Sequence, residues 1–272
     1  GIVSEIVETI EVNGLASALD LIAQLNDEKL NTYAQTVLQD GLSEMQFIDW
    51  MADRYGTGRM VYRNTRRSIS GFPTRHSEFY HLKEQTTLDW LIEWLPNIAD
   101  KKVLIICHSA EAAQSISENI NQRTLIRSGA FHEHYSLVER DQIAARFTEE
   151  DGIQILVSSE IGGEGRNFQH AQHLVLFDLP SNPDLLEQRI GRLDRLGQTH
   201  DVHVHVPYLV GSMQERLFNW YNRGLNAFCR TTSNGDQVNH AFSEQLKSYL
   251  LGHDDDETLL DEANIYHEAL LK

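Results

Sequence analysis

The sequence predicts an α/β fold in which a parallel sheet has helices on both faces and is preceded by a helical segment. From about residue 85 onward, short aliphatic and β-branched runs alternate with segments that start at helix-capping residues, a pattern typical of strands joined by helical crossovers. The runs "VLIIC" (103–107) and "LVLF" (174–177) are continuously apolar, as strands buried on both faces are. The residues before this region show helical periodicity instead.

The N-terminal part is expected to contain two helices and a connection. Apolar residues recur on one side of 14–40, namely Leu15, Leu19, Leu21, Ile22 and Leu25. A second helix should cover 43–56, because Ser43 and Gln46 form a capping box and a glycine ends the pattern. Residues 61–76 are polar, basic and interrupted by glycine and proline, which indicates a linker or hinge.

The α/β region can be followed element by element. Each expected strand leads into a helix that starts at a recognisable cap or into a loop. In chain order the expected elements are strand 102–107, a helix capped by Ser109, the run "TLIRSG" (124–129), a helix with a capping box from Ser136 to Glu139, strand 153–158, strand 173–178, a helix with Asn182 as cap and Pro183 as first residue, strand 202–209, and a helix with a box from Ser212 to Glu215.

Three segments are expected along the chain: a helical segment with a hinge or linker over 1–84, the sheet-containing lobe over 85–230, and a helical, acidic tail over 231–272. The run "GHDDDETLLDEA" (252–263) in the tail indicates a solvated end rather than a binding element. The N-terminus lacks the pattern of a signal peptide and no apolar stretch approaches a membrane-spanning length, so no membrane segment is expected. The start at Gly1 rather than a methionine indicates a processed or excised chain.

Charge and cysteine content limit the function classes. The 272 residues include 40 acids and 23 Lys and Arg, a net charge of −17. This balance argues against a free-standing nucleic-acid binder, because phosphate contacts require a cationic surface, so any such contact must be local or assisted. Cys107 and Cys229 provide no disulfide framework and are expected to be reduced thiols in an intracellular protein.

The most informative stretch is "EQRIGRLDRLGQ" (187–198), which spaces Arg189, Arg192 and Arg195 three residues apart. On a helix these arginines would share a face and repel one another. No acid stands three or four residues from any of them, although acids from elsewhere in the fold could supply partners. Gly191 within a helix would cost about 1 kcal/mol relative to alanine and indicates a close approach. The segment is therefore interpreted as built to receive an anion.

A glycine-rich loop, "SSEIGGEGRNF" (158–168), follows a predicted buried strand. Its backbone N–H groups could approach a phosphate or ribose closely, but a flexible crossover turn explains the glycines equally well. A dinucleotide fingerprint is not favoured, because Phe168 stands where the third glycine belongs. The run "GTGRM" (56–60) lacks the spacing of a phosphate-binding loop, and no D-E-x-[DH] box follows a strand.

Two groups of histidines raise other hypotheses. His203 and His205 would share a face of a strand, with His200 nearby, but no further ligand clearly completes a metal site, so no metal is expected. His132 and its neighbours precede a helix cap, where a contact with phosphate and ordinary surface packing are both compatible with the sequence.

The order of these motifs resembles motifs four, five and six of superfamily two helicases. The motifs are "KVLIICHS", "FHEHYSLVERD", "ILVSSEIGGEGRNFQ" and "LVLFDLPSNPDLLEQRIGRLDRLGQ". The last motif is similar to the SWI/SNF pattern Q-R-x-x-R-x-x-R-x-G-Q. The sequences "GRNFQ" and "HVPYL" resemble those of the bacterial RNA polymerase-associated ATPases of that type. The resemblance covers roughly 50–230 and is most specific over 153–208, whereas the first 50 residues and the acidic tail carry little family information.

The resemblance implies a RecA-like second lobe, the helicase C-terminal lobe. ATP with magnesium would be bound mainly by a first lobe that this chain lacks, and the second lobe would supply arginines across the cleft. By position, the implied catalytic residues are Arg192 and Arg195; the implied ATP-binding residues are Gln188, Gly165, Arg166 and Asn167; the implied nucleic-acid-binding residues are His108, Ser109, His132 and Ser159.

The expected function is that of the second motor lobe of an ATP-dependent DNA translocase that acts with RNA polymerase in polymerase recycling, in the bacterial cytoplasm. Its partners would be double-stranded DNA or an RNA backbone, RNA polymerase and the first motor lobe, with no membrane. The chain alone should be inactive, since it lacks the phosphate loop. One alternative is a lobe of a DEAD-type RNA helicase, although Gln188 stands where that type usually has histidine. The other is a non-catalytic module whose arginine helix docks an acidic surface.

Overall fold

The chain forms two compact units, Gly1–Gly71 and Phe72–Lys272. The computed structural model describes residues 2–25, 27–40, 44, 47–48, 51, 74–98, 100–160, 168, 170–194, 198, 200–230, 234–253 and 258–271. The division between the units precedes the predicted boundary after residue 84, and the segment over 231–272 belongs to the second unit. Each unit is described by itself.

The described part of the first unit is helical. The single helix expected over 14–40 is divided into three elements, and the helix over 2–13 was not predicted. This unit contains α1 (Ile2–Asn13), η1 (Leu15–Ala18), α2 (Leu19–Ala23) and α3 (Glu28–Asp40). Its own apolar core includes Leu15, Ile22 and Phe47. Most of the predicted helix over 43–56 and most of the predicted linker over 61–76 lie outside the described residues.

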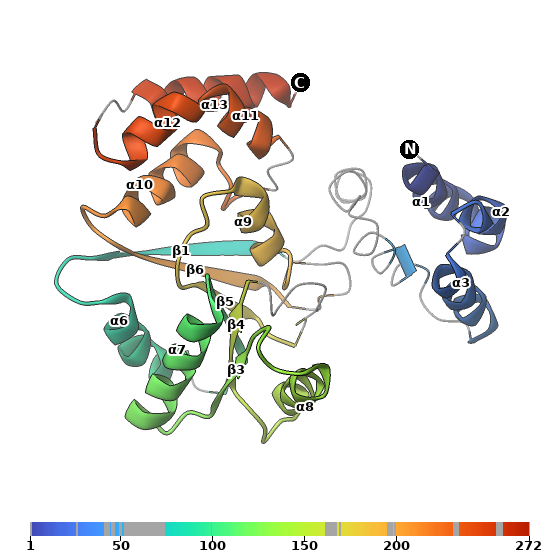
Figure 1. The fold of residues 1–272 in the computed structure, drawn as a ribbon, viewed down its shortest axis with the longest axis horizontal. Coiled ribbons are helices and arrows are strands. Elements are labelled where there is room, and N and C mark those ends of the chain that lie inside the picture. Colours follow the sequence, from blue (N-terminus) through green and yellow to red (C-terminus); the bar gives the residue numbers. More distant parts are fainter. Residues whose placement is uncertain are drawn as a thin grey trace. The chain divides into compact units, whose positions relative to one another are not determined.

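The second unit is built on a six-stranded, fully parallel sheet with the order β1-β6-β5-β2-β4-β3 (Figure 1), which confirms the predicted fold class. The strands are β1 (Arg75–Leu82), β2 (Val103–Cys107), β3 (Ser128–Phe131), β4 (Ile155–Ser159), β5 (His173–Leu176) and β6 (Val202–Leu209). Strand β1 was not predicted, because its sequence "RHSEFYHL" is polar at many positions. It is an edge strand with β6 as its single neighbour, so it needs fewer apolar residues.

Helices cover both faces of this sheet. In Figure 1, α10 to α13 lie on one side of the β1–β6 pair, and α6 and α7 lie on the other side. The caps predicted at Ser109, Ser136 and Asn182 are confirmed, each side chain accepting a hydrogen bond from a backbone N–H of its helix. The helical elements are α6 (Thr87–Trp94), η2 (Leu95–Ile98), α7 (Ala110–Arg123), α8 (Leu137–Thr148), α9 (Pro183–Ile190), α10 (Met213–Asn219), η3 (Trp220–Gly224), α11 (Gly235–Ala241), α12 (Ser243–Leu250) and α13 (Thr258–Leu270).

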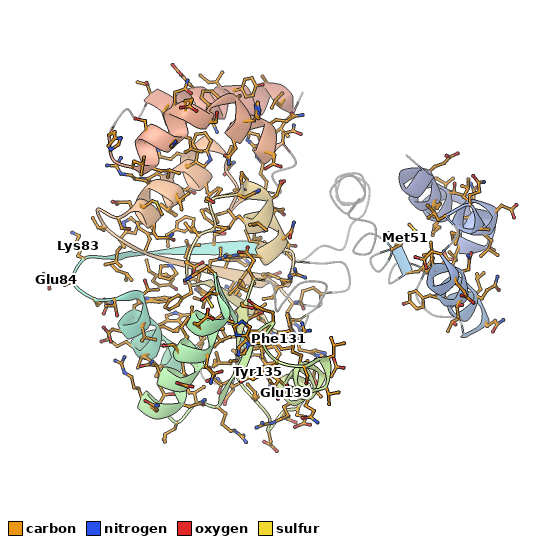
Figure 2. All side chains as sticks on the ribbon, in the orientation of Figure 1. Met51, Lys83, Glu84, Phe131, Tyr135 and Glu139 are labelled. Atoms are coloured by element: carbon orange, nitrogen blue, oxygen red, sulfur yellow. The ribbon has the colours of Figure 1, made fainter. Side chains whose placement is uncertain are left out.

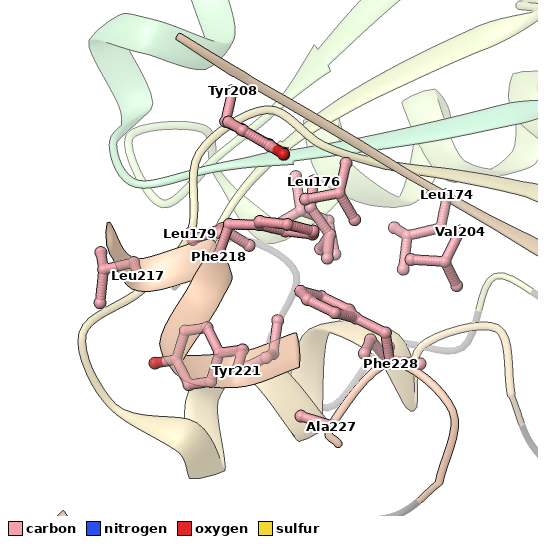
Figure 3. Packing of buried hydrophobic residues seen from close by; sticks show 14 of the residues in the cluster. Leu174, Leu176, Leu179, Val204, Tyr208, Leu217, Phe218, Tyr221, Ala227 and Phe228 are labelled. Carbon is pink, nitrogen blue, oxygen red and sulfur yellow. The ribbon is translucent and has the colours of Figure 1, made fainter. Parts of the chain in front are cut away.

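Alternating residues of the strands separate two cores. On one face, Ile105 and its neighbours pack with residues of α6 and α7. On the other face, Leu174, Val204 and similar residues pack with α8, α9 and the elements that follow β6. Figure 3 shows the second core, where the ring of Phe218 lies near that of Tyr208, with ring centroids 4.3 Å apart.

The C-terminal segment differs from the solvated end that the acidic run suggested. Leu259 and Leu260 of α13 are 6% and 1% exposed and belong to the same core as the sheet. Because acids surround these leucines in the sequence, the apolar face of the helix was not recognised. Residues 254–257 lie outside the described part. Across the described ranges, no helix combines the length and the apolar character needed to cross a lipid bilayer.

Candidate functional site

The helix that carries the arginine motif ends earlier than expected. Helix α9 stops at Ile190, and Gly191 is its C-cap with φ −61° and ψ −10°. A Cβ at Gly191 would lie 3.1 Å from the carbonyl oxygen of Glu187, so the close approach is to the helix itself. The helix on which the arginines would share a face therefore ends before Arg192. Arg195 lies outside the described residues.

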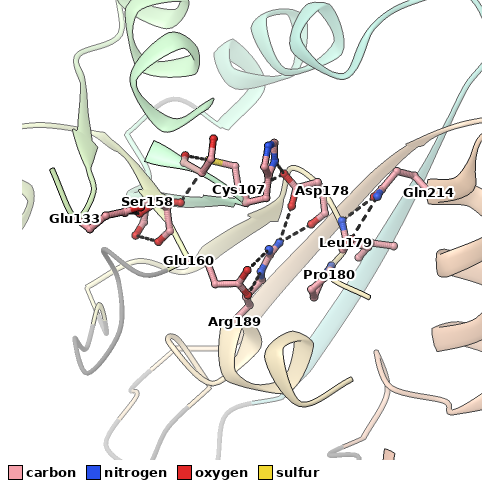
Figure 4. Close-up of polar contacts among 12 residues, drawn as sticks. Cys107, Glu133, Ser158, Glu160, Asp178, Leu179, Pro180, Arg189 and Gln214 are labelled. Carbon is pink, nitrogen blue, oxygen red and sulfur yellow. Dashed lines mark hydrogen bonds and ion pairs between the residues drawn. The ribbon is translucent and has the colours of Figure 1, made fainter. Parts of the chain in front are cut away.

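Arg189 has its counter-ions within the chain. Its Nε and Nη2 donate to the two carboxylate oxygens of Glu160 at 3.2 and 3.1 Å, and its Nη1 donates to the Asp178 carboxylate at 2.9 Å and to the Asp178 carbonyl at 2.7 Å (Figure 4). Burial acts to lower the pKa of Arg189, but the two acids outweigh it and the pKa is raised. The interpretation that the motif awaits an external anion is wrong for Arg189, whose partners lie one residue after β4 and two residues after β5.

Asp178 also reaches the residue after β2. Its second carboxylate oxygen accepts a hydrogen bond from the backbone N–H of His108 at 3.0 Å and contacts the His108 ring Nδ1 at 2.8 Å. The His108 side chain is 69% exposed. Asp178 therefore joins a predicted nucleic-acid-binding residue to the arginine helix.

The other predicted nucleic-acid-binding residues are less accessible. Ser109 caps α7, and its hydroxyl accepts from Ala112 N–H at 3.1 Å. The Ser159 hydroxyl donates to the Glu133 carboxylate at 2.5 Å, and Ser159 is 1% exposed. His132 is 5% exposed. Contact of Ser159 or His132 with a nucleic acid would require local rearrangement.

Intramolecular packing accounts for the buried position of His132. Its ring stacks on Tyr135, with centroids 4.0 Å apart, and its Nε2 lies 3.4 Å from the Gln114 side-chain oxygen. Figure 2 shows Tyr135 on the connection between β3 and α8, between the labelled Phe131 and Glu139. Burial, followed by the nearby His134, lowers the pKa of His132, so the neutral ring is favoured.

The two cysteines are free thiols, as predicted. Cys107, at the end of β2, is buried, and burial together with the nearby Asp178 raises the pKa of its thiol to about 12. Its Sγ lies 3.6 Å from the carbonyl oxygen of Ser158 (Figure 4). The thiol is therefore protonated and unreactive at neutral pH.

The glycine-rich loop and the arginine segment meet at both ends of the loop. Glu160, near the start of the loop, binds Arg189 as described above. Phe168, its last residue, donates its backbone N–H to the carbonyl oxygen of Arg192 at 3.4 Å. Arg192 is 8% exposed, and Gln188 is exposed. The predicted residues Gly165, Arg166 and Asn167 lie outside the described residues.

Three charged residues of this region were missed at the sequence level: Arg75, Glu160 and Asp178. Two of them had a usable signal, because Glu160 and Asp178 lie within two residues of the carboxyl ends of parallel strands, where such sheets place functional groups. Arg75 had none. It starts β1, and its guanidinium binds Asp194 and Glu187.

Histidines form a row across three strands of the sheet. His76, His203 and His173 are paired in register, and His205 lies on the same face as His203, as predicted. Burial, followed by neighbouring histidines, lowers the pKa of His173 to about 4 and that of His205 to about 3. Among the residues with described positions, no group of three or more His, Cys, Asp or Glu is arranged to hold a metal ion.

Two family models match the second unit. Residues 86–197 match the helicase conserved C-terminal domain, and residues 201–272 match the RNA polymerase recycling family C-terminal region. The second match corrects the expectation that the C-terminal segment carries little family information.

Curated relatives match most of the chain. The RNA polymerase-associated protein RapA of Pseudomonas fluorescens (strain Pf0-1) is 42% identical over 276 residues, an alignment that covers 86% of this chain and 29% of the relative. That of Stutzerimonas stutzeri (strain A1501) is 44% identical over 265 residues, covering 83% of this chain and 28% of the relative. The chain therefore spans less than a third of the length of these relatives.

The chain is also similar in fold to solved structures. One is the C-terminal part of the Fun30 ATPase domain, which matches with a TM-score of 0.46 and 21% sequence identity, covering 63% of this chain and 56% of that one. A DEAD box protein from Methanococcus jannaschii has a TM-score of 0.48 and 16% identity over 62% of this chain and 47% of that one.

Proposed function

The chain carries a RapA-like helicase C-terminal lobe of RecA-like fold, and from this premise we propose that it is the second motor lobe of an ATP-dependent DNA translocase of the SWI/SNF type. In the whole protein, ATP hydrolysis would move this lobe against a first lobe and drive stepping along a nucleic acid. The alternatives, a DEAD-type RNA helicase lobe and a non-catalytic module, are not favoured. Gln188 and the RapA relatives argue against the first, and the internal pairing of Arg189 removes much of the basis for the second.

One observation carries this proposal: the glycine-rich loop is fastened at both ends to the arginine segment. Glu160 binds Arg189, and Phe168 N–H binds the carbonyl oxygen of Arg192. A lobe that completes a nucleotide site from one side must bring its anion-binding backbone and its cationic side chains to the same place. Two sequence-distant motifs held together in this way fit that requirement.

The arginines have separate roles in this proposal. Arg189 is a fixed member of an ion-pair cluster and holds the site together. Arg192 and Arg195 would stabilise the charge that develops on the transferred phosphoryl group. Because Arg192 is 8% exposed, it would have to change rotamer to reach a phosphate, and closure of the two lobes would supply the anion that favours the new position.

The remaining nucleotide contacts divide between the lobes. Gln188 would help order the γ-phosphate end, and Gly165, Arg166 and Asn167 would line the ribose side. Magnesium would neutralise the phosphates when bound. The described residues of this chain contain no group arranged to hold a metal, so the magnesium ligands would come from the first lobe, as would the phosphate loop.

Nucleic acid and RNA polymerase are the proposed partners. Among the four predicted nucleic-acid-binding residues, His108 has the largely exposed side chain, at 69%, and it should make the first contact with a backbone phosphate. The match to the RNA polymerase recycling family and the RapA relatives support polymerase recycling in the bacterial cytoplasm as the setting. The net charge of −17 implies that the first lobe or the polymerase assists DNA binding.

Steady-state ATP hydrolysis by the full-length protein tests this function. Arg192→Ala and Arg195→Ala should each lower kcat by about 10³-fold and leave ATP affinity largely intact, because such arginines act mainly on the transition state. Arg123→Ala is the control, since Arg123 belongs to a surface ion pair with Asp89. Unchanged turnover in both variants would contradict the proposal, as would robust hydrolysis by the 272-residue chain without a first-lobe fragment.

A further inference from the structure

Arg75 is the first residue of β1, the edge strand of the sheet. In the β1–β6 register it stands opposite Val202, a residue of the core that contains Leu186 and Ile190 of α9. Its side chain therefore lies on the face of the sheet that α9 covers. It is 5% exposed, so this guanidinium is buried between the strand and the segment that follows α9.

All three nitrogens of the Arg75 guanidinium donate hydrogen bonds. Nε and Nη2 both donate to one carboxylate oxygen of Asp194, at 2.9 and 2.5 Å. Nη2 also donates to the Glu187 carboxylate at 3.4 Å, and Nη1 donates to the carbonyl oxygen of Ala227 at 3.2 Å. The Asp194 side chain is 0% exposed, so the buried arginine offsets part of the cost of burying this carboxylate. Burial acts to lower the pKa of Arg75, but Glu187 and Asp194 outweigh it and the pKa is raised.

These partners are sequence neighbours of residues proposed to act on ATP. Glu187 directly precedes Gln188, while Asp194 stands between Arg192 and Arg195. Residues 191–194 form turns rather than a regular continuation of α9, and their backbone N–H groups donate to carbonyl oxygens of residues 187, 189 and 190. Arg75 adds a side-chain contact at each end of the segment 187–194. One guanidinium that touches both ends of this segment can set its conformation.

We propose that Arg75 is a positioning residue for Arg192. It holds the turn after α9 through Asp194 and the last turn of α9 through Glu187, so that the backbone that carries Arg192 is in place when a phosphate arrives. The catalytic part of this inference rests on the proposed function. Arg75 itself touches no nucleotide.

The first test is the kinetics of ATP hydrolysis by the full-length protein. Arg75→Met should lower kcat by about 10²-fold, because small displacements of catalytic groups have effects of this size, while the KM for ATP stays within about threefold. Arg75→Lys should be intermediate, since an ammonium keeps the charge but lacks the planar fork. Arg123→Met, which breaks an exposed Arg–Asp pair, should leave kcat unchanged.

A double variant separates positioning from stability. The double variant Arg75→Met with Asp194→Asn removes both buried charges, so its melting temperature should return toward that of the wild type. Its ATP turnover should stay low, because residue 75 no longer holds the turn after α9. Recovery of turnover together with stability would overturn the proposal. So would a kcat for Arg75→Met within about threefold of the wild type.

Hydrogen exchange of backbone amides tests the positioning without ATP. Exchange over 187–194 should accelerate about tenfold in Arg75→Met, while exchange in α7 should not change, and Arg123→Met should match the wild type throughout. Unaltered exchange over 187–194 would overturn the inference even if the protein hydrolyses ATP. If turnover does not depend on Arg192, the proposed function fails along with the catalytic part of the inference, and the exchange data still decide whether Arg75 orders the turn.

Discussion

The ion-pair cluster of Arg189 should be a large contributor to the stability of the second unit. Replacing Arg189 with methionine keeps much of the side-chain length but leaves the carboxylates of Glu160 and Asp178 without their cation. Breaking a buried pair from one side typically costs 3–5 kcal/mol. Glu160 and Asp178 are 24% and 19% exposed, and Asp178 keeps its contacts with His108, so water and these contacts reduce the loss to about 2–4 kcal/mol.

Differential scanning calorimetry of the chain measures this loss. For a unit of this size, 2–4 kcal/mol corresponds to a fall of roughly 5–15 °C in Tm. Arg123→Met is the matched control, because the Arg123–Asp89 pair has a similar distance of 2.8 Å but side chains that are 41% and 42% exposed. It should change stability by less than about 1 kcal/mol. If Arg189→Met costs no more than Arg123→Met, the cluster does not stabilise the fold and the role given to Arg189 is wrong.

Two further predictions concern the histidine row and the C-terminal helices. The pKa values of His173 and His205 lie at about 4 and about 3 in the folded chain, below the usual value of about 6.5, so the unfolded chain binds more protons as the pH falls. The contribution of these two histidines to the free energy of unfolding should be fully present above about pH 6.5 and decline toward pH 4, by at most about 1.4 kcal/mol per pH unit for each histidine. Urea unfolding at several pH values measures this decline. If the free energy of unfolding of His205→Gln fell with pH as steeply as that of the wild type, the prediction would be contradicted. Leu260→Ala should destabilise the second unit by about 2–4 kcal/mol, because Leu260 is 1% exposed. Leu251→Ala, at a leucine that is 58% exposed, should change stability by no more than about 0.5 kcal/mol, and equal effects of the two substitutions would show that α13 is not part of the core.

The sequence predicted those features whose determinants lie close together along the chain. The Ser136 cap and its Glu139 partner are three residues apart, and both reciprocal hydrogen bonds are present. The apolar run 103–107 is buried at every position. In both cases a few consecutive residues contain all the information, so local rules were sufficient.

The features that were missed depend on residues far apart in sequence. Strand β1 forms because β6, more than a hundred residues later, offers it an edge. Arg189 pairs with Glu160, which is 29 residues away, and Arg75 with Asp194, which is 119 residues away. Rules based on spacings of three and four residues compare an arginine with its helical neighbours alone, so they classified Arg189 as unpaired.

The position of β1 matters for anyone who expresses a fragment of this lobe. The match to the helicase domain begins at residue 86, after the edge strand has ended at Leu82. A fragment cut at that boundary would leave one side of β6 without its hydrogen-bonding neighbour, and an open, apolar strand edge invites self-association. A cut at residue 86 would also remove Arg75, the ion-pair partner of the buried carboxylate of Asp194. A soluble fragment should therefore start upstream of residue 74.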